Sequence, residues 1–199
     1  MIGGTRLWLL RHAETEWSLS GQHTSFTDIP LTPRGEDMAR LLGRSLAGKS
    51  FSLVLVSPRQ RAQRTCELAG FKSQAETCED LSEWNYGSYE GRTTPDIRKE
   101  QPGWTIWNGQ TPGGEAAAEV GNRCQRVIER AKEAGGDVAL FAHGHVLRVM
   151  AATWLGLQPT EGRCFTLGTG TYCVLGYEHE YTTTLVWNQS VQAVVEAIE

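Results

Sequence analysis

Three short apolar runs, at residues 7–10, 53–56 and 138–142, constrain the fold of this chain more than any other feature. Each run is continuous rather than alternating and is too short for a buried helix, which is typical of strands covered on both faces of a sheet. Stretches with helical periodicity separate the runs. This alternation predicts an α/β fold, a three-layer α/β/α sandwich with a mostly parallel central sheet.

Helix and strand signals place the other elements along the chain. Residues 13–30 have no sustained period and predict a loop, after which Thr32 is a candidate N-cap and Pro33 a candidate first helical residue. Periodicity and end signals predict further helices at residues 33–46, 95–99, 113–134 and 146–155. β-rich closing segments are predicted at residues 163–166, 171–177 and 182–187.

A second helix start follows the middle apolar run. Ser57 is a candidate N-cap, and Pro58 is a candidate first residue of the helix. This register places Arg59 in the first helical turn, directly after a strand. Arg61 and Arg64 lie further along and are expected on the solvated face of the helix.

Basic side chains follow all three apolar runs. Arg11 and His12 end the first run, Arg59 follows the second and His143 follows the third. An Arg-His pair by itself is typical of an ordinary surface loop. Because open α/β sheets bring strand ends to one edge, we expect these groups to share a pocket.

Glu83 is the acid that we expect to join this pocket. It lies among Trp84, Tyr86 and Tyr89, and a carboxyl surrounded by aromatic residues loses water, which favours its protonated form. Arginines bind non-bridging phosphate oxygens, a neutral imidazole attacks phosphorus, and a carboxylic acid protonates the departing oxygen. The set therefore indicates phosphoryl transfer.

Composition excludes several other classes of function. The 199 residues carry a net charge of −4, which gives no electrostatic footprint for nucleic acid or an anionic membrane. The five cysteines form no C-x-x-C pair, so a disulfide framework and a zinc knuckle are not indicated, and a cytoplasmic location is expected. No apolar run approaches a membrane span, and the first residues lack a signal-peptide core. We expect one domain over residues 1–199, with an irregular lid or substrate insertion at about 84–112.

An ordered series of motifs resembles the histidine phosphatase superfamily, also called the phosphoglycerate-mutase-like family. The resemblance runs from about residue 7 to 176 and rests on LRHAET at 10–15, DIPLTPRG at 28–35, SPRQRA at 57–62, Glu83 with Gly87 and EG at 90–91, PGGE at 112–115 and AHGH at 142–145. One departure is Ala13, where the family usually has glycine.

The resemblance implies a role for each matching residue. His12 would be the nucleophile that becomes phosphohistidine, Arg11, Arg59 and His143 would bind the phosphoryl group, and Glu83 would protonate the leaving group and later activate water. The positive charges of Arg11 and Arg59 would lower the pKa of His12 and keep it neutral. Residues implied in substrate binding are Ser18, Gln22, His23, Thr24, Gly144 and Thr169.

Other side chains near these motifs have less defined roles. His145 is interpreted as a supporting group rather than a reacting one, and Trp104 and Trp107 are left open between a substrate wall and ordinary packing. A metal site built from the histidines is disfavoured because two arginines would lie beside the ion. No metal and no cofactor are therefore expected.

Within the family, the sequence favours the phosphatase branch over the mutases. Residues 92–112 contain only three basic residues, Arg92, Arg98 and Lys99, whereas cofactor-dependent mutases carry longer, more basic insertions. Small phosphorylated metabolites, namely sugar phosphates or phosphoglycerate-like acids, are the expected substrates. The alternatives are phosphoglycerate-mutase-type transfer and an idle phosphate-binding protein. A homodimer is left open.

Overall fold

A six-stranded sheet forms the centre of the computed structural model, which describes residues 4–190. Its strands are β1 (Arg6–Arg11), β2 (Leu53–Val56), β3 (Ala75–Thr77), β4 (Asp137–Ala142), β5 (Thr171–Glu178) and β6 (Tyr181–Ser190), in the order β3-β2-β4-β1-β5-β6. The first four strands are mutually parallel, whereas β5 runs antiparallel to its neighbours β1 and β6. Residues 1–3 and 191–199 of the predicted domain lie outside the described part.

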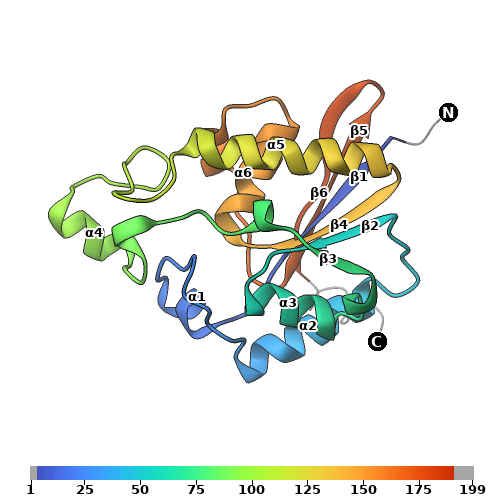
Figure 1. The fold of residues 1–199 in the computed structure, drawn as a ribbon, viewed down its shortest axis with the longest axis horizontal. Helices are drawn as coiled ribbons and strands as arrows, with labels where there is room; N and C mark the ends of the chain where they lie inside the picture. The colour runs from blue at the N-terminus through green and yellow to red at the C-terminus, as the bar shows by residue number, and fades with distance from the viewer. Residues whose placement is uncertain (1–3, 191–199) are drawn as a thin grey trace.

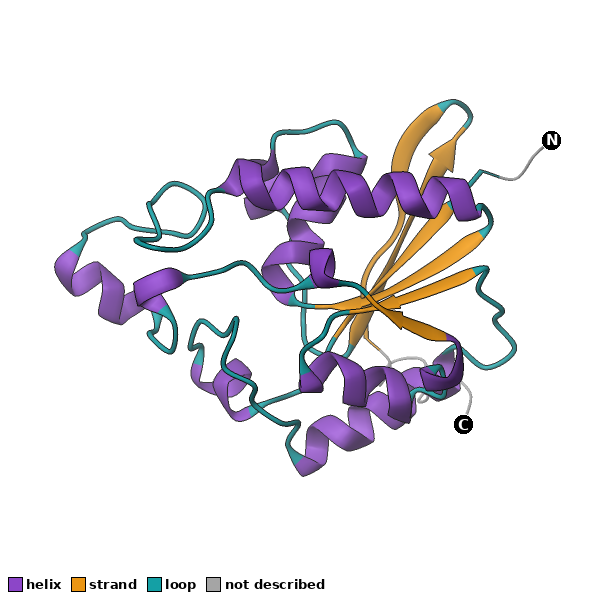
Figure 2. Ribbon diagram, in the orientation of Figure 1, coloured by secondary structure: helices purple, strands orange, loops and turns teal. Residues whose placement is uncertain are grey.

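Helices cover both faces of this sheet (Figures 1 and 2). The α-helices are α1 (Glu16–Ser20), α2 (Pro33–Ser45), α3 (Gln60–Leu68), α4 (Thr94–Glu100), α5 (Ala117–Ala134) and α6 (Gly144–Trp154). The short 3₁₀ helices are η1 (Lys72–Gln74), η2 (Glu79–Leu81), η3 (Gly87–Tyr89) and η4 (Pro159–Cys164). Helices α5 and α6 lie on one side and α2 and α3 on the other, which confirms the predicted three-layer α/β/α sandwich.

The alternation of side chains along β1 explains why both faces need a covering layer. Leu7 and Leu9 join the apolar cluster under α5 and α6, whereas Trp8 and Leu10 join the cluster over α2 and α3. All four side chains are buried. An apolar residue on each face of the strand is stable only when both faces are shielded from water.

The register of the parallel strands brings their carboxyl ends to one edge. Arg11 pairs with Ala142 across β1 and β4. Two further backbone bonds extend the register beyond the strands: the His12 N–H donates to the Ala142 carbonyl at 2.9 Å, and the Ser57 N–H donates to the Phe141 carbonyl at 2.9 Å. The residues that follow the three apolar runs are therefore neighbours in space, as the sequence predicts.

Local structure differs from the sequence prediction at several boundaries. The predicted loop at 13–30 contains α1, and β3 was not predicted, because an element of three to five residues leaves little periodicity. The segment 163–166 is not a strand; it overlaps the end of η4. Helix α3 begins at Gln60 rather than at Pro58, with Arg59 as its N-cap residue. This shift of two residues changes which arginine faces the sheet.

The segment 84–112 is ordered and lies beyond the sheet edge, together with α1 and α4, at the left of Figure 1. Its side chains Tyr86, Ile97 and Trp104 are buried in the main apolar cluster. This packing holds the segment against the carboxyl ends of the strands. Within residues 4–190, none of the helices is long and apolar enough to cross a membrane.

Candidate active site

His12 lies just past β1 with a single defined tautomer. Its Nδ1–H donates to the Ala13 carbonyl at 2.8 Å, and because a carbonyl can only accept, the proton resides on Nδ1 and Nε2 keeps its lone pair. The pKa of His12 is held well below 6.5, first by burial and then by the positive charges of Arg61 and Arg11. The His12 imidazole is therefore neutral, with a free Nε2 lone pair, in a cationic setting.

Arg11 provides a cation beside His12. One of its terminal amino groups donates to the Leu167 carbonyl, and burial lowers its pKa from the usual value. The Nε of Arg11 is buried and has no hydrogen-bond partner within residues 4–190. A buried guanidinium N–H without a protein acceptor is a ready donor for an anionic oxygen.

Gly144 allows Arg11 to approach the start of α6. A Cβ at this position would stand 3.3 Å from Arg11 Cζ and 3.4 Å from Arg11 Nε, closer than side chains normally pack. Glycine thus combines two roles: it begins the helix, where N–H groups favour anions, and it leaves space for the guanidinium.

Arg61, near the end of the middle strand, is buried against His143, contrary to the sequence prediction that it is solvated. Its side chain is almost fully buried, and its Nε–H donates to His143 Nδ1 at 3.1 Å. Its terminal amino groups donate to the carbonyls of Thr24, Ser25 and Thr27 at 3.1–3.2 Å. Arg61 thus connects the loop after α1 to His143, at the carboxyl end of β4.

His143 is fully buried, with both ring nitrogens engaged. Because Arg61 donates to Nδ1, neutral His143 carries its proton on Nε2, which donates to Ser57 Oγ at 2.7 Å. Burial, followed by the charge of Arg61, lowers the pKa of His143 well below 6.5. Its ring meets the His12 ring edge-on, with centroids 5.2 Å apart. His143 therefore supports His12 and Arg61 in this structure, whereas the sequence predicts direct contact with the phosphoryl group.

Arg59 does not line the cavity beside His12, and neither does Arg61. The Arg59 guanidinium lies over the Phe26 ring, 4.9 Å from the centroid, and its buried Nε has no hydrogen-bond partner within residues 4–190. The difference arises because α3 does not begin where the sequence predicts. The Ser57 hydroxyl bonds to His143 instead of capping α3, so the helix begins at Gln60 and the Arg61 side chain is buried. The cations that lower the pKa of His12 are Arg61 and Arg11, so Arg61 takes the place of the predicted Arg59 beside Arg11.

Glu83 is buried at the amino end of α6. Its oxygens accept three backbone hydrogen bonds, from Trp84 at 2.9 Å, His145 at 3.0 Å and Val146 at 2.9 Å. The carboxyl group therefore meets N–H donors, and not only the aromatic residues that the sequence predicts around it. These bonds hold the group in one orientation beside the cavity.

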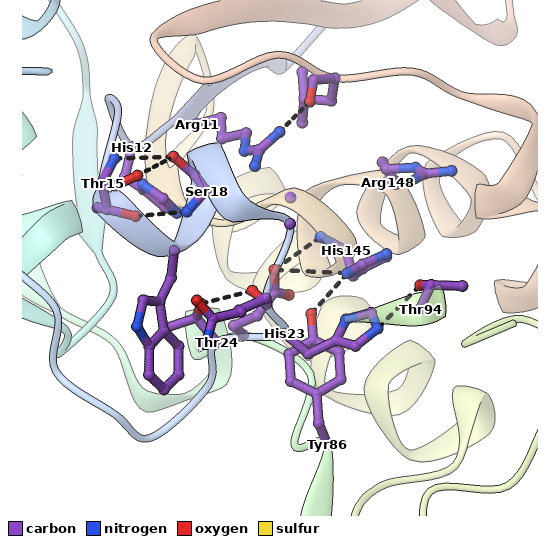
Figure 3. Close-up of a pocket in the computed structure, with 16 residues that line it drawn as sticks. Arg11, His12, Thr15, Ser18, His23, Thr24, Tyr86, Thr94, His145 and Arg148 are labelled. Carbon is purple, nitrogen blue, oxygen red and sulfur yellow. Dashed lines mark hydrogen bonds and ion pairs between the residues drawn. The ribbon is translucent and has the colours of Figure 1, made fainter. Parts of the chain in front are cut away.

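A cavity of about 280 Å³ connects these groups (Figure 3). Arg11, His12 and Glu83 line it, whereas His143 does not. Of the six predicted substrate-binding residues, those that also line the cavity are Ser18, Gln22, His23, Thr24 and Gly144.

The predicted substrate residues differ in how free their side chains are. The Ser18 hydroxyl donates to the Thr15 carbonyl at 2.8 Å and accepts from the Thr15 N–H, so it caps α1. Gln22 donates to the Gly91 carbonyl at 2.8 Å. Thr169 does not line the cavity; its neighbour Gly170 donates its N–H to the His12 carbonyl at 3.1 Å. The turn at 168–170 thus reaches the site through its main chain.

The cavity wall away from His12 is largely neutral and aromatic. His23, Tyr86 and Thr94 lie together there, with the His23 and Tyr86 rings 4.7 Å apart and Thr94 Oγ1 3.3 Å from His23 Nε2. Burial lowers the pKa of His23 to about 4. Arg148 adds a cation at the rim and stacks over Trp107.

The model of the histidine phosphatase superfamily (branch 1) matches residues 7–190. This chain belongs to that superfamily. The acid phosphatase of Mycobacterium tuberculosis is 40% identical over 178 residues, which cover 87% of the histidine phosphatase described here and 87% of that protein. The sedoheptulose 1,7-bisphosphatase of Saccharomyces cerevisiae is 35% identical over 195 residues, covering 81% and 71% respectively. A solved structure of an open reading frame product of M. tuberculosis superposes with a TM-score of 0.88 at 36% identity, covering 94% of this chain and 98% of that chain.

These similarities confirm the family and the fold that the motifs predict. Ala13, the departure from the family pattern, is fully buried, and its N–H donates to Thr65 Oγ1 at 3.1 Å. The histidine phosphatase accommodates the methyl group while the Ala13 carbonyl still fixes His12.

Sequence reasoning missed several residues of the site. Arg61 had a signal, because it shares a helical face with Ala62, Thr65 and Cys66, all buried in α3. The sequence carries no specific signal for three other cavity residues, Tyr86, Thr94 and Arg148, because each reaches the cavity only through the packing of distant segments. Trp104 is buried and donates to the Gln110 carbonyl at 3.0 Å, so it packs behind the wall of this histidine phosphatase.

Proposed function

We propose that this histidine phosphatase hydrolyses small phosphorylated metabolites, sugar phosphates or phosphoglycerate-like acids, through a phosphohistidine at His12. The observation that carries the proposal is the fixed tautomer of His12, which presents an Nε2 lone pair beside Arg11. The acid phosphatase and the sedoheptulose bisphosphatase among its relatives support this substrate class.

In the first step, the Nε2 lone pair of His12 attacks phosphorus, and the phosphorus–oxygen ester bond breaks. Protonated Glu83 gives its proton to the departing oxygen, which leaves as an alcohol. Arg11 binds the non-bridging oxygens of the phosphoryl group. The N–H of Gly144, at the start of α6 beside Arg11, adds a donor for the same oxygens. Arg61 contributes positive charge that favours neutral His12.

In the second step, the Glu83 carboxylate takes a proton from a water molecule, whose oxygen attacks phosphorus. The phosphorus–nitrogen bond breaks, inorganic phosphate leaves, and Nε2 regains its lone pair. Glu83 ends the cycle protonated, so the same two groups are ready for another turnover.

Replacement of His12 tests the nucleophile. His12→Asn should abolish hydrolysis of phosphomonoesters and prevent formation of an acid-labile phosphoenzyme. His179→Asn is the matched control, because the His179 side chain is 81% exposed and far along the chain in the β5–β6 turn. Phosphate release by His12→Asn at the wild-type rate would contradict the proposal.

Mutase-type transfer and idle phosphate binding are separated by a substrate panel. Phosphomonoesters are incubated with and without added bisphosphoglycerate, and both free phosphate and isomerised product are measured. The proposal predicts free phosphate in both conditions. Isomer without free phosphate would favour a mutase, and neither product would favour a binding protein.

Three broader features complete the proposal. The chain forms one domain, in which the segment 84–112 is the wall of the cavity on the substrate side. The presence of Tyr86 and Thr94 in the cavity lining supports this role of the segment. Five cysteines without a C-x-x-C pair support a cytoplasmic location. A homodimer through the sheet edge is supported by β6, where Tyr181 is 68% and Leu185 46% exposed; light scattering tests it.

A further inference from the structure

A hydrogen-bonded pair, Tyr86 and His145, lies beside Glu83 and takes no part in the phosphoryl transfer described above. The Tyr86 hydroxyl and His145 Nδ1 are 2.7 Å apart. The His145 backbone N–H is one of the donors to Glu83, and its Nδ1 lies 4.0 Å from Glu83 Oε2. The pair is therefore fixed to the group that faces the leaving oxygen.

The Tyr86 hydroxyl determines which nitrogen of His145 carries the proton. A phenol is a stronger donor than an imidazole N–H, and an imidazole nitrogen is a stronger acceptor than a phenol oxygen, so Tyr86 donates to Nδ1. Burial raises the pKa of Tyr86 well above its usual value, which keeps this donor protonated. Neutral His145 must then carry its proton on Nε2.

His145 remains neutral because burial, followed by the charge of Arg148, lowers its pKa well below 6.5. Its ring is held on other sides by Trp107, at 5.3 Å between centroids, and by His23, at 6.1 Å. The side chain is nevertheless 21% exposed and lines the cavity, on the side opposite Arg11 and His12 in Figure 3. A rigid, neutral N–H donor therefore lies at the leaving-group end of the cavity.

We propose that Tyr86 and His145 form a specificity-determining pair, in which the Nε2–H of His145 binds a hydroxyl oxygen of the departing alcohol and Tyr86 positions that donor. This inference rests on the proposed function and narrows the substrate to phosphate esters of polyhydroxylated alcohols. The neutral hydroxyls of Thr24 and Thr94 on the same cavity suit such a leaving group. A neutral N–H donor suits a hydroxyl oxygen, and the cation on this part of the cavity, Arg148, donates to the Gly162 carbonyl and stacks over Trp107.

Matched substrates test the inference. Glycerol 3-phosphate and n-propyl phosphate have leaving groups of the same length that differ in two hydroxyls. The measured quantity is the kcat/KM for glycerol 3-phosphate divided by the kcat/KM for n-propyl phosphate. His145→Ala should lower this ratio about tenfold, chiefly through a higher KM for glycerol 3-phosphate. His145→Gln, whose side-chain amide can place an N–H near the former Nε2, should restore most of the ratio.

Tyr86→Phe should lower the same ratio about threefold, and adding it to His145→Ala should cause no further loss. Tyr89→Phe is the matched control, because Tyr89 is a buried tyrosine of the same segment whose ring packs on Trp104. Equal losses on both substrates would indicate a merely structural role and overturn the inference. An unchanged ratio in His145→Ala would also overturn it.

The tautomer of His145 gives a readout that does not depend on turnover. Long-range proton–nitrogen correlation spectra of the wild-type protein should show the Nε2–H form, and Tyr86→Phe should lose that preference. The Nδ1–H form in the wild type would overturn the inference. If the wild type hydrolyses no monoester, the proposed function fails, while the tautomer still reports on the pair.

Discussion

Arg61 donates its Nε–H to Nδ1 of His143 over 3.1 Å, and this bond joins the middle strand end to the third one. Because the same guanidinium also binds the carbonyls of the loop at 24–27, one buried side chain orders much of the site. The rings of His143 and His12 are in contact, so Arg61 acts on His12 both through packing and through its charge.

Replacing Arg61 should therefore affect catalysis far more than replacing its neighbours. We expect Arg61→Met to lower kcat/KM by about 10²–10⁴-fold, the range for a positioned electrostatic group. Arg59→Met should cost less than about tenfold, since its guanidinium packs on Phe26. Arg64→Met, which breaks only half-exposed ion pairs with Glu36 and Glu67, is the control. A larger loss for Arg59 than for Arg61 would restore the assignment made from sequence.

The pH dependence of kcat/KM should report the electrostatic setting of His12. Burial, Arg61 and Arg11 hold the pKa of His12 well below 6.5, so the nucleophile stays neutral and the acid limb should lie below that pH. Arg61→Met removes the second of these causes, and the limb should move to higher pH. Measurement of pH–rate profiles for both proteins checks the shift, and coincident acid limbs would exclude Arg61 as its cause.

Glu83→Gln should slow turnover in a way that depends on the leaving group. Glutamine keeps one acceptor oxygen, enough for the Trp84 and Val146 N–H groups that share Oε1, but it loses the acceptor for the His145 N–H and cannot supply the proton. We expect a loss of about 10²–10⁴-fold for alkyl phosphates, whose alcohols need protonation, and a smaller loss for p-nitrophenyl phosphate. Equal losses for both would argue that Glu83 only orders the start of α6.

Gly144→Ala should weaken phosphate binding without unfolding the protein. The added Cβ would lie 3.3 Å from Arg11 Cζ, and the guanidinium must shift by a few tenths of an ångström to relieve the contact. We expect the inhibition constant of inorganic phosphate to rise about tenfold, equivalent to losing one well-placed charged hydrogen bond. Thermal unfolding of the variant provides the control for stability.

The stability of the protein should fall as the pH drops below about 6.5. His12, His23, His143 and His145 all have lowered pKa values, that of His23 being about 4. The unfolded chain binds protons at these positions below pH 6.5 and the folded chain does not, so the free energy of unfolding rises with pH there and levels off above it. The slope should reach about 1.4 kcal/mol per pH unit for each such histidine. Urea unfolding at several pH values checks this, and His23→Gln should reduce the slope whereas His179→Asn should not.

Much of this fold could be predicted from local sequence because its signals are local. The apolar runs at 7–10, 53–56 and 138–142 became β1, β2 and β4, and Thr32 accepts a hydrogen bond from Gly35 as the predicted cap of α2. The predicted start of a helix was wrong where a side chain bonds to a residue distant in the sequence. Ser57 has the signature of an N-cap, but its hydroxyl binds His143, eighty-six residues away in the sequence.

The sequence by itself determined the three-layer architecture, the family and the positions of Arg11, His12 and Glu83, because periodicity and ordered motifs are properties of the chain. Only the tertiary structure decided that Arg61 rather than Arg59 bonds to His143, and that His145 lines the cavity in contact with the Tyr86 hydroxyl. These outcomes depend on contacts between segments 59 to 82 residues apart, which compete with local helix and capping preferences and override them.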